Sequence, residues 1–235
     1  MLTRVVFNQK GGVGKSSITV NLAAISAKKG LRTLVIDLDP QANSSQYLLG
    51  EDATYSADKA ALEPNIENFF DDILGTTQQK SLIGNAIGSI LKTPRSKGLD
   101  SYVHRTSFEN LDVIPASPSL GALEHALESK HKIYKLRDSI QSLSARYDRI
   151  FIDTPPAFNF FTLSALISAD RVLIPFDCDV FSKRALQTLI ENVLETQDDH
   201  NDRLEIEGIV VNQFQSQAKL PREVVQQLKD EGLPV

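Results

Sequence analysis

The chain has little of what secreted or membrane-embedded proteins rely on. Cys178 is the only cysteine among 235 residues, so no disulfide can form within the chain, which is typical of a reducing compartment. No apolar segment approaches the ~20 residues that span a bilayer, and no apolar signal core precedes the first predicted strand. We therefore expect a soluble, cytoplasmic protein.

Positive charge and clusters of metal ligands are also scarce. With 25 Lys and Arg against 30 Asp and Glu, the net charge is −5, so any DNA contact would need a local basic patch. The histidines are scattered among polar residues without paired Cys or His spacing; they are His104, His125, His131 and His200. This pattern favours surface histidines over a metal site.

What the chain does contain is a regular alternation of strands and helices. Short apolar, β-branched runs recur with helical patterns between most of them, at residues 4–7, 33–36, 111–114, 149–152, 171–175 and 207–211. Strands that alternate with helices predict an α/β fold with a doubly wound, mostly parallel sheet. At this length we expect one domain over residues 1–235.

Two regions depart from the alternation. Residues 50–110 contain a predicted helix at 65–74, a polar and glycine-containing stretch, and apolar residues at helical spacing over 81–91. We interpret this region as a surface excursion whose 81–91 helix packs on the body or binds a partner. The final residues, 229–235, are typical of a helix end, a turn and the start of another strand, which predicts a chain that continues past Val235.

The most specific motif is a glycine-rich loop between the first predicted strand and a helix predicted at 18–27. It consists of Lys10, Gly11, Gly12, Val13, Gly14, Lys15, Ser16 and Ser17. In the ordinary phosphate loop, G-x-x-x-x-G-K-[ST], backbone N–H groups cradle phosphate and the lysine reaches the β/γ-phosphates. Here Gln9 and Lys10 replace the first glycine, so the motif is deviant and has a second cation. A plain glycine turn with a solvated Lys15 would leave the strand-loop-helix order unexplained.

Carboxylates follow two other predicted strands. Asp37 and Asp39 come after the second strand, where Pro40 ends it, and Asp153 ends the fourth. An isolated Asp at a strand end is more often a cap or turn residue, but a phosphate loop upstream reverses those odds. Because ligands bind beyond the carboxyl ends of such strands, these groups can converge. We predict that Asp39 positions the attacking water, and that Ser16 and Asp153 bind Mg²⁺, Asp153 through its water shell.

Together these motifs resemble those of the ParA/MinD-type deviant Walker ATPases, and the ParA/Soj group more closely. The resemblance extends through residues 169–175 to 210–212 and covers nearly the whole chain except 50–110. It implies that Lys10 reaches across an ATP-sandwich homodimer to the partner's phosphates while Lys15 holds phosphate in its own subunit. It also implies that Asn212 contacts the adenine edge, although a turn-capping asparagine is the alternative.

The resemblance further implies a function. We expect slow ATP hydrolysis, stimulated by a ParB-like or other cargo-adaptor protein, in an ATP-bound dimer that binds DNA nonspecifically and positions plasmid, chromosome or protein cargo. Such a protein would associate with the nucleoid. The candidate DNA contacts are few, and acidic residues lie near them; the candidates are Lys183, Arg184, Lys219 and Arg222.

Two other functions fit the motifs. One is a MinD-like switch that recruits proteins or membrane in its ATP state without binding DNA; the end of the chain shows no membrane-binding amphipathic helix. The other is a metabolic enzyme that transfers phosphate to a small substrate. Lys10 argues against the metabolic enzyme.

Overall fold

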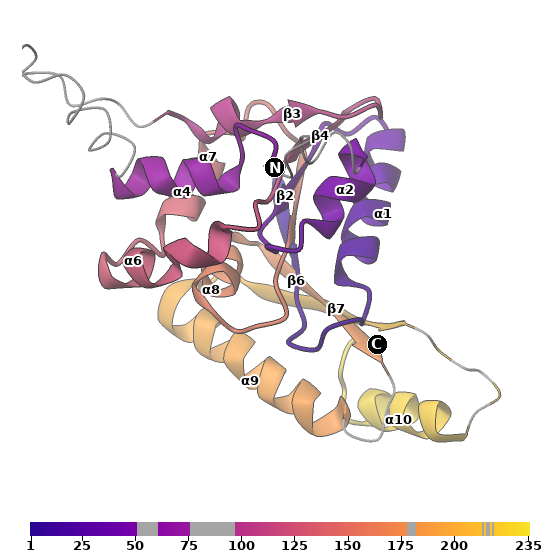
Figure 1. Ribbon diagram of the computed structural model, residues 1–235. Helices are drawn as coiled ribbons and strands as arrows, with labels where there is room; N and C mark the ends of the chain where they lie inside the picture. The colour runs from indigo at the N-terminus through magenta and orange to yellow at the C-terminus, as the bar shows by residue number, and fades with distance from the viewer. Residues whose placement is uncertain (51–60, 76–96, 178–181, 213, 215–216, 218) are drawn as a thin grey trace, which may run out of the picture.

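The fold is built on one twisted sheet with helices on both faces (Figure 1). The computed structural model describes residues 1–50, 61–75, 97–177, 182–212, 214, 217 and 219–235. Within them the strands lie in the order β3-β4-β2-β5-β1-β6-β7. Their bounds are β1 Leu2–Val6, β2 Thr33–Asp37, β3 His104–Arg105, β4 Leu111–Ile114, β5 Arg149–Asp153, β6 Arg171–Asp177 and β7 Glu205–Asn212.

The strand predictions and the fold class are confirmed. All six predicted runs form strands, and every neighbouring pair among them is parallel. The exception to parallel pairing is β3, an edge strand of two residues that runs antiparallel to β4. It was not predicted, because two residues are too short to show an alternating pattern.

Helices cover the sheet in two layers. They are α1 Lys15–Lys28, α2 Asn43–Leu49, α4 Ile66–Leu74, α6 Glu124–Ser129, α7 Lys135–Gln141, α8 Phe160–Ser168, α9 Ser182–His200 and α10 Lys219–Asp230, with 3₁₀ turns η1 Leu99–Tyr102 and η2 Leu120–Leu123. The first two pack on one face, against Val35 and Phe151, while α4, α7, α8 and α9 contribute to the core on the other.

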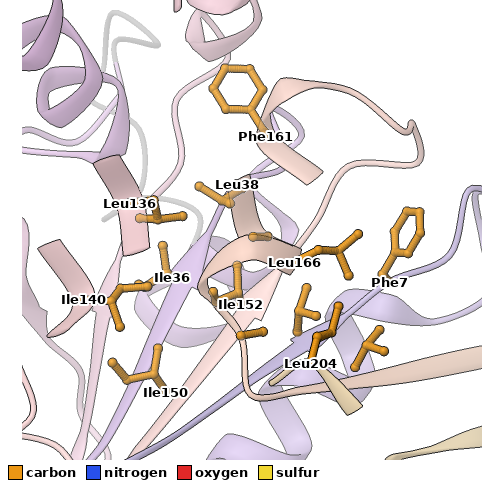
Figure 2. Packing of buried hydrophobic residues seen from close by; sticks show 14 of the residues in the cluster. Phe7, Ile36, Leu38, Leu136, Ile140, Ile150, Ile152, Phe161, Leu166 and Leu204 are labelled. Carbon is orange, nitrogen blue, oxygen red and sulfur yellow. The ribbon is translucent and has the colours of Figure 1, made fainter. Parts of the chain in front are cut away.

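The central strands are buried on both faces, which is why they read as continuous apolar runs. Successive side chains of a strand point to opposite faces. In β5, Ile150 and Ile152 therefore join the larger core, shown in Figure 2, whereas Phe151 joins the smaller core beneath α1 and α2. This double burial fixes the sheet from which the loops of the candidate site extend.

Part of the region interpreted as a surface excursion belongs to the core, so that interpretation needs correction for its described residues. Helix α4 begins at a capping box, in which Asn65 accepts a hydrogen bond from the backbone N–H of Asn68 at 3.2 Å and the Asn68 side chain accepts one in return. Its Phe69 and Phe70 are buried, and the Phe69 ring packs edge-on against Tyr102 of η1. The predicted 81–91 helix lies outside the described residues.

The last residues return to the sheet beside β7. Helix α10 ends at Asp230, and Gly232 follows with a φ of 78°. The backbone N–H of Ile209 then donates to the carbonyl of Pro234 at 2.7 Å. The strand expected near the end of the chain is represented among the described residues by this one contact.

Candidate active site

The glycine-rich loop joins the end of β1 to the start of α1. Gly12 and Gly14 have φ values of 77° and 90°, in the left-handed region that glycine enters without strain. A Cβ on Gly14 would also collide with the side-chain amide of Asn212, whereas the space beside Gly11 and Gly12 is open. The loop therefore forms a cradle at the N-terminus of α1, where helix N–H groups favour an anion.

The two lysines of the loop lie in different surroundings. Lys15, the first residue of α1, is only 6% exposed, and its Nζ donates to the carbonyl of Lys10 at 3.1 Å. Burial lowers the pKa of Lys15, an effect that the nearby carboxylates Asp153 and Asp39 partly offset. Lys10 instead lies near the surface, where its Nζ forms an ion pair with Asp177 at 2.6 Å.

The predicted carboxylates gather at the same end of the sheet. Asp37 and Asp153 end the adjacent strands β2 and β5 as registered partners, and both are buried. Burial raises the pKa of Asp153 to about 6, although hydrogen bonds from Ser16 and Ser44 oppose the shift. Ser44 Oγ donates to Asp153 Oδ2 at 2.7 Å. The predicted metal pair, Ser16 and Asp153, is thus brought together.

Asp39 is held close to this group by its own turn. It is buried, and its Oδ1 accepts a hydrogen bond from the backbone N–H of Gln41 at 2.9 Å. Burial raises the pKa of Asp39, and the Gln41 hydrogen bond and the charge of Lys15 oppose the rise. Asp39 and Lys15 therefore interact electrostatically.

Asp37 shapes the turn that carries Asp39, a role that sequence reasoning missed. Its Oδ2 accepts hydrogen bonds from the backbone N–H and hydroxyl of Ser45 at 2.9 and 2.7 Å, and its Oδ1 accepts the backbone N–H of Asp39 at 3.1 Å. Ser45 Oγ also accepts the backbone N–H of Ala116 at 3.0 Å. Burial and the adjacent Asp153 raise the pKa of Asp37 to about 8. The signal in the sequence was a serine pair, 44 and 45, shortly after the strand.

Two asparagines brace the glycine-rich loop. Asn212, the last residue of β7, donates its side-chain N–H to the carbonyl of Val13 at 3.0 Å. Asn8 donates to the carbonyl of Pro175 at 2.6 Å and accepts the backbone N–H of Lys10 at 2.8 Å. Sequence reasoning selected Asn212 as a base contact and did not select Asn8, whose partner is 167 positions away along the chain.

The predicted DNA-contacting residues belong to the first turns of two helices, α9 and α10. Lys183 and Arg184 belong to the start of α9, and Lys219 and Arg222 to the start of α10. The arginine side chains are exposed, and so are the acidic residues farther along α9 and after it: Glu191, Glu195, Asp198, Asp199 and Asp202. Among the described helices, none is long and apolar enough to cross a membrane.

Comparison with known proteins identifies the family. Residues 2–206 match the family model AAA_31, described as an AAA domain. The chromosome partitioning protein ParA of Myxococcus xanthus is 33% identical over 225 residues, which cover 95% of this chain and 69% of that protein. This chain belongs to the ParA family of P-loop ATPases. The chromosome partitioning protein ParA of Caulobacter vibrioides is 30% identical over 95% of the chain and 74% of its own length.

The ParA-family fold is shared with a synthase. Cobyrinic acid a,c-diamide synthase from Mycobacterium smegmatis, solved with an ATP analogue and magnesium, superposes with a TM-score of 0.80 at 25% identity. The match covers all of this chain and 84% of the synthase. Within this ParA-family chain, the family match includes Lys10, Lys15, Asp39 and Asp153, while Asn212 lies beyond it.

Proposed function

We propose that the protein is a Mg²⁺-dependent ATPase that dimerises around ATP and uses this state to position DNA or a macromolecular cargo. The observation that carries the proposal is that the two lysines of one loop differ in burial. Lys15 is buried among the carboxylates, whereas Lys10 lies at the surface, where a second subunit has access to it. Similarity to partitioning proteins at 33% and 30% identity supports the same reading.

The chain's own residues fit ATP and Mg²⁺. The loop from Lys10 to Ser17 would hold the phosphates through backbone N–H groups and the ammonium of Lys15. Ser16 and Asp153 offer hard oxygen atoms, and Mg²⁺ in nucleotide sites is commonly held by one or two carboxylates plus phosphate oxygens. When bound, Mg²⁺ neutralises negative charge on the phosphates. Asn212 would approach the base from β7 while it braces Val13.

Asp39 would orient the attacking water. Gln41 holds one of its carboxylate oxygens, and the other accepts no hydrogen bond from the described residues. A fixed carboxylate of this kind can accept a hydrogen bond from water and aim it at a phosphorus atom. Asp37 would keep the turn in place without touching the reactants, because its three hydrogen bonds come from Asp39 in the turn and from Ser45 in α2.

Dimerisation would complete each site. A cation supplied by a second subunit stabilises the charge of the transition state, as an arginine finger does. If Lys10 is that cation, an isolated subunit hydrolyses ATP slowly. Slow hydrolysis sets the lifetime of the ATP-bound dimer, and an adaptor protein of the ParB kind would shorten that lifetime.

DNA would bind in the ATP state through the start of α9 and α10. Lys183, Arg184, Lys219 and Arg222 supply the positive charge, against a net negative body. Binding that depends on a few phosphate contacts weakens steeply with salt. The competing function is a switch that recruits proteins or membrane without DNA, and the exposed acidic residues along α9 favour it.

The test is DNA binding by the Asp39→Ala protein with ATP, with ADP and without nucleotide, across a salt series. We expect retention that requires ATP and falls as salt rises. The double variant Arg184→Ala/Arg222→Ala should flatten the slope of log affinity against log salt by about 2, close to one unit for each lost contact.

Three lysines elsewhere on the molecule provide the matched control. Lys97, Lys132 and Lys135 line one cavity beside α4 and α7, on other elements than α9 and α10. Replacing two of these lysines by alanine removes the same charge and should leave the salt slope unchanged. An ATP-dependent dimer that does not retain DNA at any salt concentration would refute the DNA-positioning function in favour of a protein- or membrane-recruiting switch.

A further inference from the structure

We propose that Asp177 holds Lys10 against its own subunit and thereby sets the threshold for ATP-dependent dimerisation. Asp177 is then a positioning residue, because it acts through Lys10 rather than on the nucleotide. The inference rests on the proposed function, in which Lys10 must reach a second copy of this chain.

The start of the glycine-rich loop is fastened to β6 at two points. Asp177 is the last residue of β6, and its Oδ2 accepts the Lys10 ammonium at 2.6 Å. Two residues earlier in the same strand, the carbonyl of Pro175 accepts the side chain of Asn8, which in turn holds the backbone N–H of Lys10 at 2.8 Å. The side chain of Lys10 is therefore bound to β6 directly, and its backbone is linked to β6 through Asn8.

A further contact links this arrangement to the nucleotide site. Lys15 Nζ donates to the carbonyl of Lys10 at 3.1 Å. A phosphate group that accepts a hydrogen bond from Lys15 competes with that carbonyl, since a charged acceptor forms the stronger hydrogen bond. Nucleotide binding within one subunit would thus loosen the backbone of Lys10 before its side chain leaves Asp177.

The ion pair has the strength that a reversible contact needs. The side chains of Lys10 and Asp177 are 42% and 27% exposed, so solvent screens their attraction. Pairs of this kind typically shift an equilibrium by at most about fivefold. The phosphates of ATP carry more negative charge than one carboxylate and can therefore take over the lysine when a second subunit presents them.

The experiment compares Asp177→Asn with the parent chain, both in the Asp39→Ala background so that the dimer accumulates. Asparagine keeps the shape of the side chain and removes its charge. We expect the protein concentration for half-maximal dimerisation with ATP, measured by analytical ultracentrifugation, to fall about two- to fivefold. Glu205→Gln removes a charge from the opposite end of the β6–β7 pair and should leave dimerisation unchanged.

A second measurement detects the contact in the monomer. Acetylation of Lys10 by a water-soluble acylating reagent, followed by mass spectrometry without nucleotide, reports how accessible the amine is. We expect a faster reaction in Asp177→Asn, relative to the exposed Lys28 as internal reference. A thermal unfolding curve like that of the parent verifies that the variant is folded.

The outcomes separate the two proposals. Equal or weaker dimerisation of Asp177→Asn, or an unchanged acetylation rate of Lys10, would overturn the role of Asp177 while the ATP-dependent dimer stands. A parent protein that stays monomeric with ATP at every concentration would overturn the proposed function, and the role of Asp177 with it.

Discussion

Replacement of Ser45 by alanine should destabilise the protein strongly although Ser45 contacts no reactant. The buried Ser45 hydroxyl donates to Asp37 Oδ2 and accepts the backbone N–H of Ala116. Alanine removes the first hydrogen bond and leaves the buried Ala116 N–H without this partner. Because Asp37 keeps its proton at neutral pH, this hydrogen bond joins neutral groups and contributes about 0.5–1.5 kcal/mol, and a buried unpaired donor costs about 1–3 kcal/mol.

Because the two terms overlap, we expect a loss of about 2 kcal/mol in the free energy of unfolding. For a chain of this size, 1 kcal/mol corresponds to about 2–4 °C in Tm, so the variant should melt roughly 4–8 °C below the parent. Circular dichroism during a thermal ramp measures the difference. Ser142→Ala is the control, because this exposed serine donates to the carbonyl of Ser139 at 2.6 Å and should change stability by at most about 0.5 kcal/mol. A Tm within about 2 °C of the parent for Ser45→Ala would refute the reasoning.

Three further predictions concern the charged groups. Lys15→Ala should abolish productive ATP binding, and normal turnover in this variant would contradict the site. Asp39→Ala should bind ATP and form a long-lived dimer without hydrolysis, as seen by phosphate release and sedimentation; a monomer without nucleotide would argue against a water-positioning role. Burial in the folded state raises the pKa of Asp37 to about 8, so Asp37 stays protonated there, whereas in the unfolded chain it ionises near pH 4. The free energy of unfolding therefore declines as pH rises from about 4 to 8. Asparagine does not titrate, so the Tm of Asp37→Asn should rise relative to that of the parent between pH 5 and pH 8, whereas parallel profiles would contradict the shift.

The sequence was sufficient for the strands and the glycine-rich loop because both are local signals. Buried parallel strands are continuous β-branched runs, and a loop that cradles phosphate needs glycine at fixed positions. The sequence also indicated that Lys15, Asp39 and Asp153 meet, since the carboxyl ends of parallel strands share one edge.

The parts that could not be predicted depend on contacts between distant residues. Asp177 lies 167 positions from Lys10, and Ala116 lies 71 positions from Ser45. Nothing in either local sequence marks such partners. The described helix α4 was misread as peripheral because polar residues surround Phe69 and Phe70 in the sequence, and the burial of Phe70 depends on α8, whose Phe161 packs against it.

The registered pairing of Asp37 with Asp153 distinguishes a rigid part of the site, the strand ends, from a part that can move, the loops. Both carboxylates end strands that are hydrogen-bonded on each side within the sheet, so their separation is set by the register and cannot change without breaking the ladder. Backbone amides of β2 and β5 should exchange with solvent deuterium only when the whole domain opens, whereas those of the loop before Lys15 exchange through small local openings. A change of nucleotide would therefore alter the conformation of the loops, while the strands keep their positions.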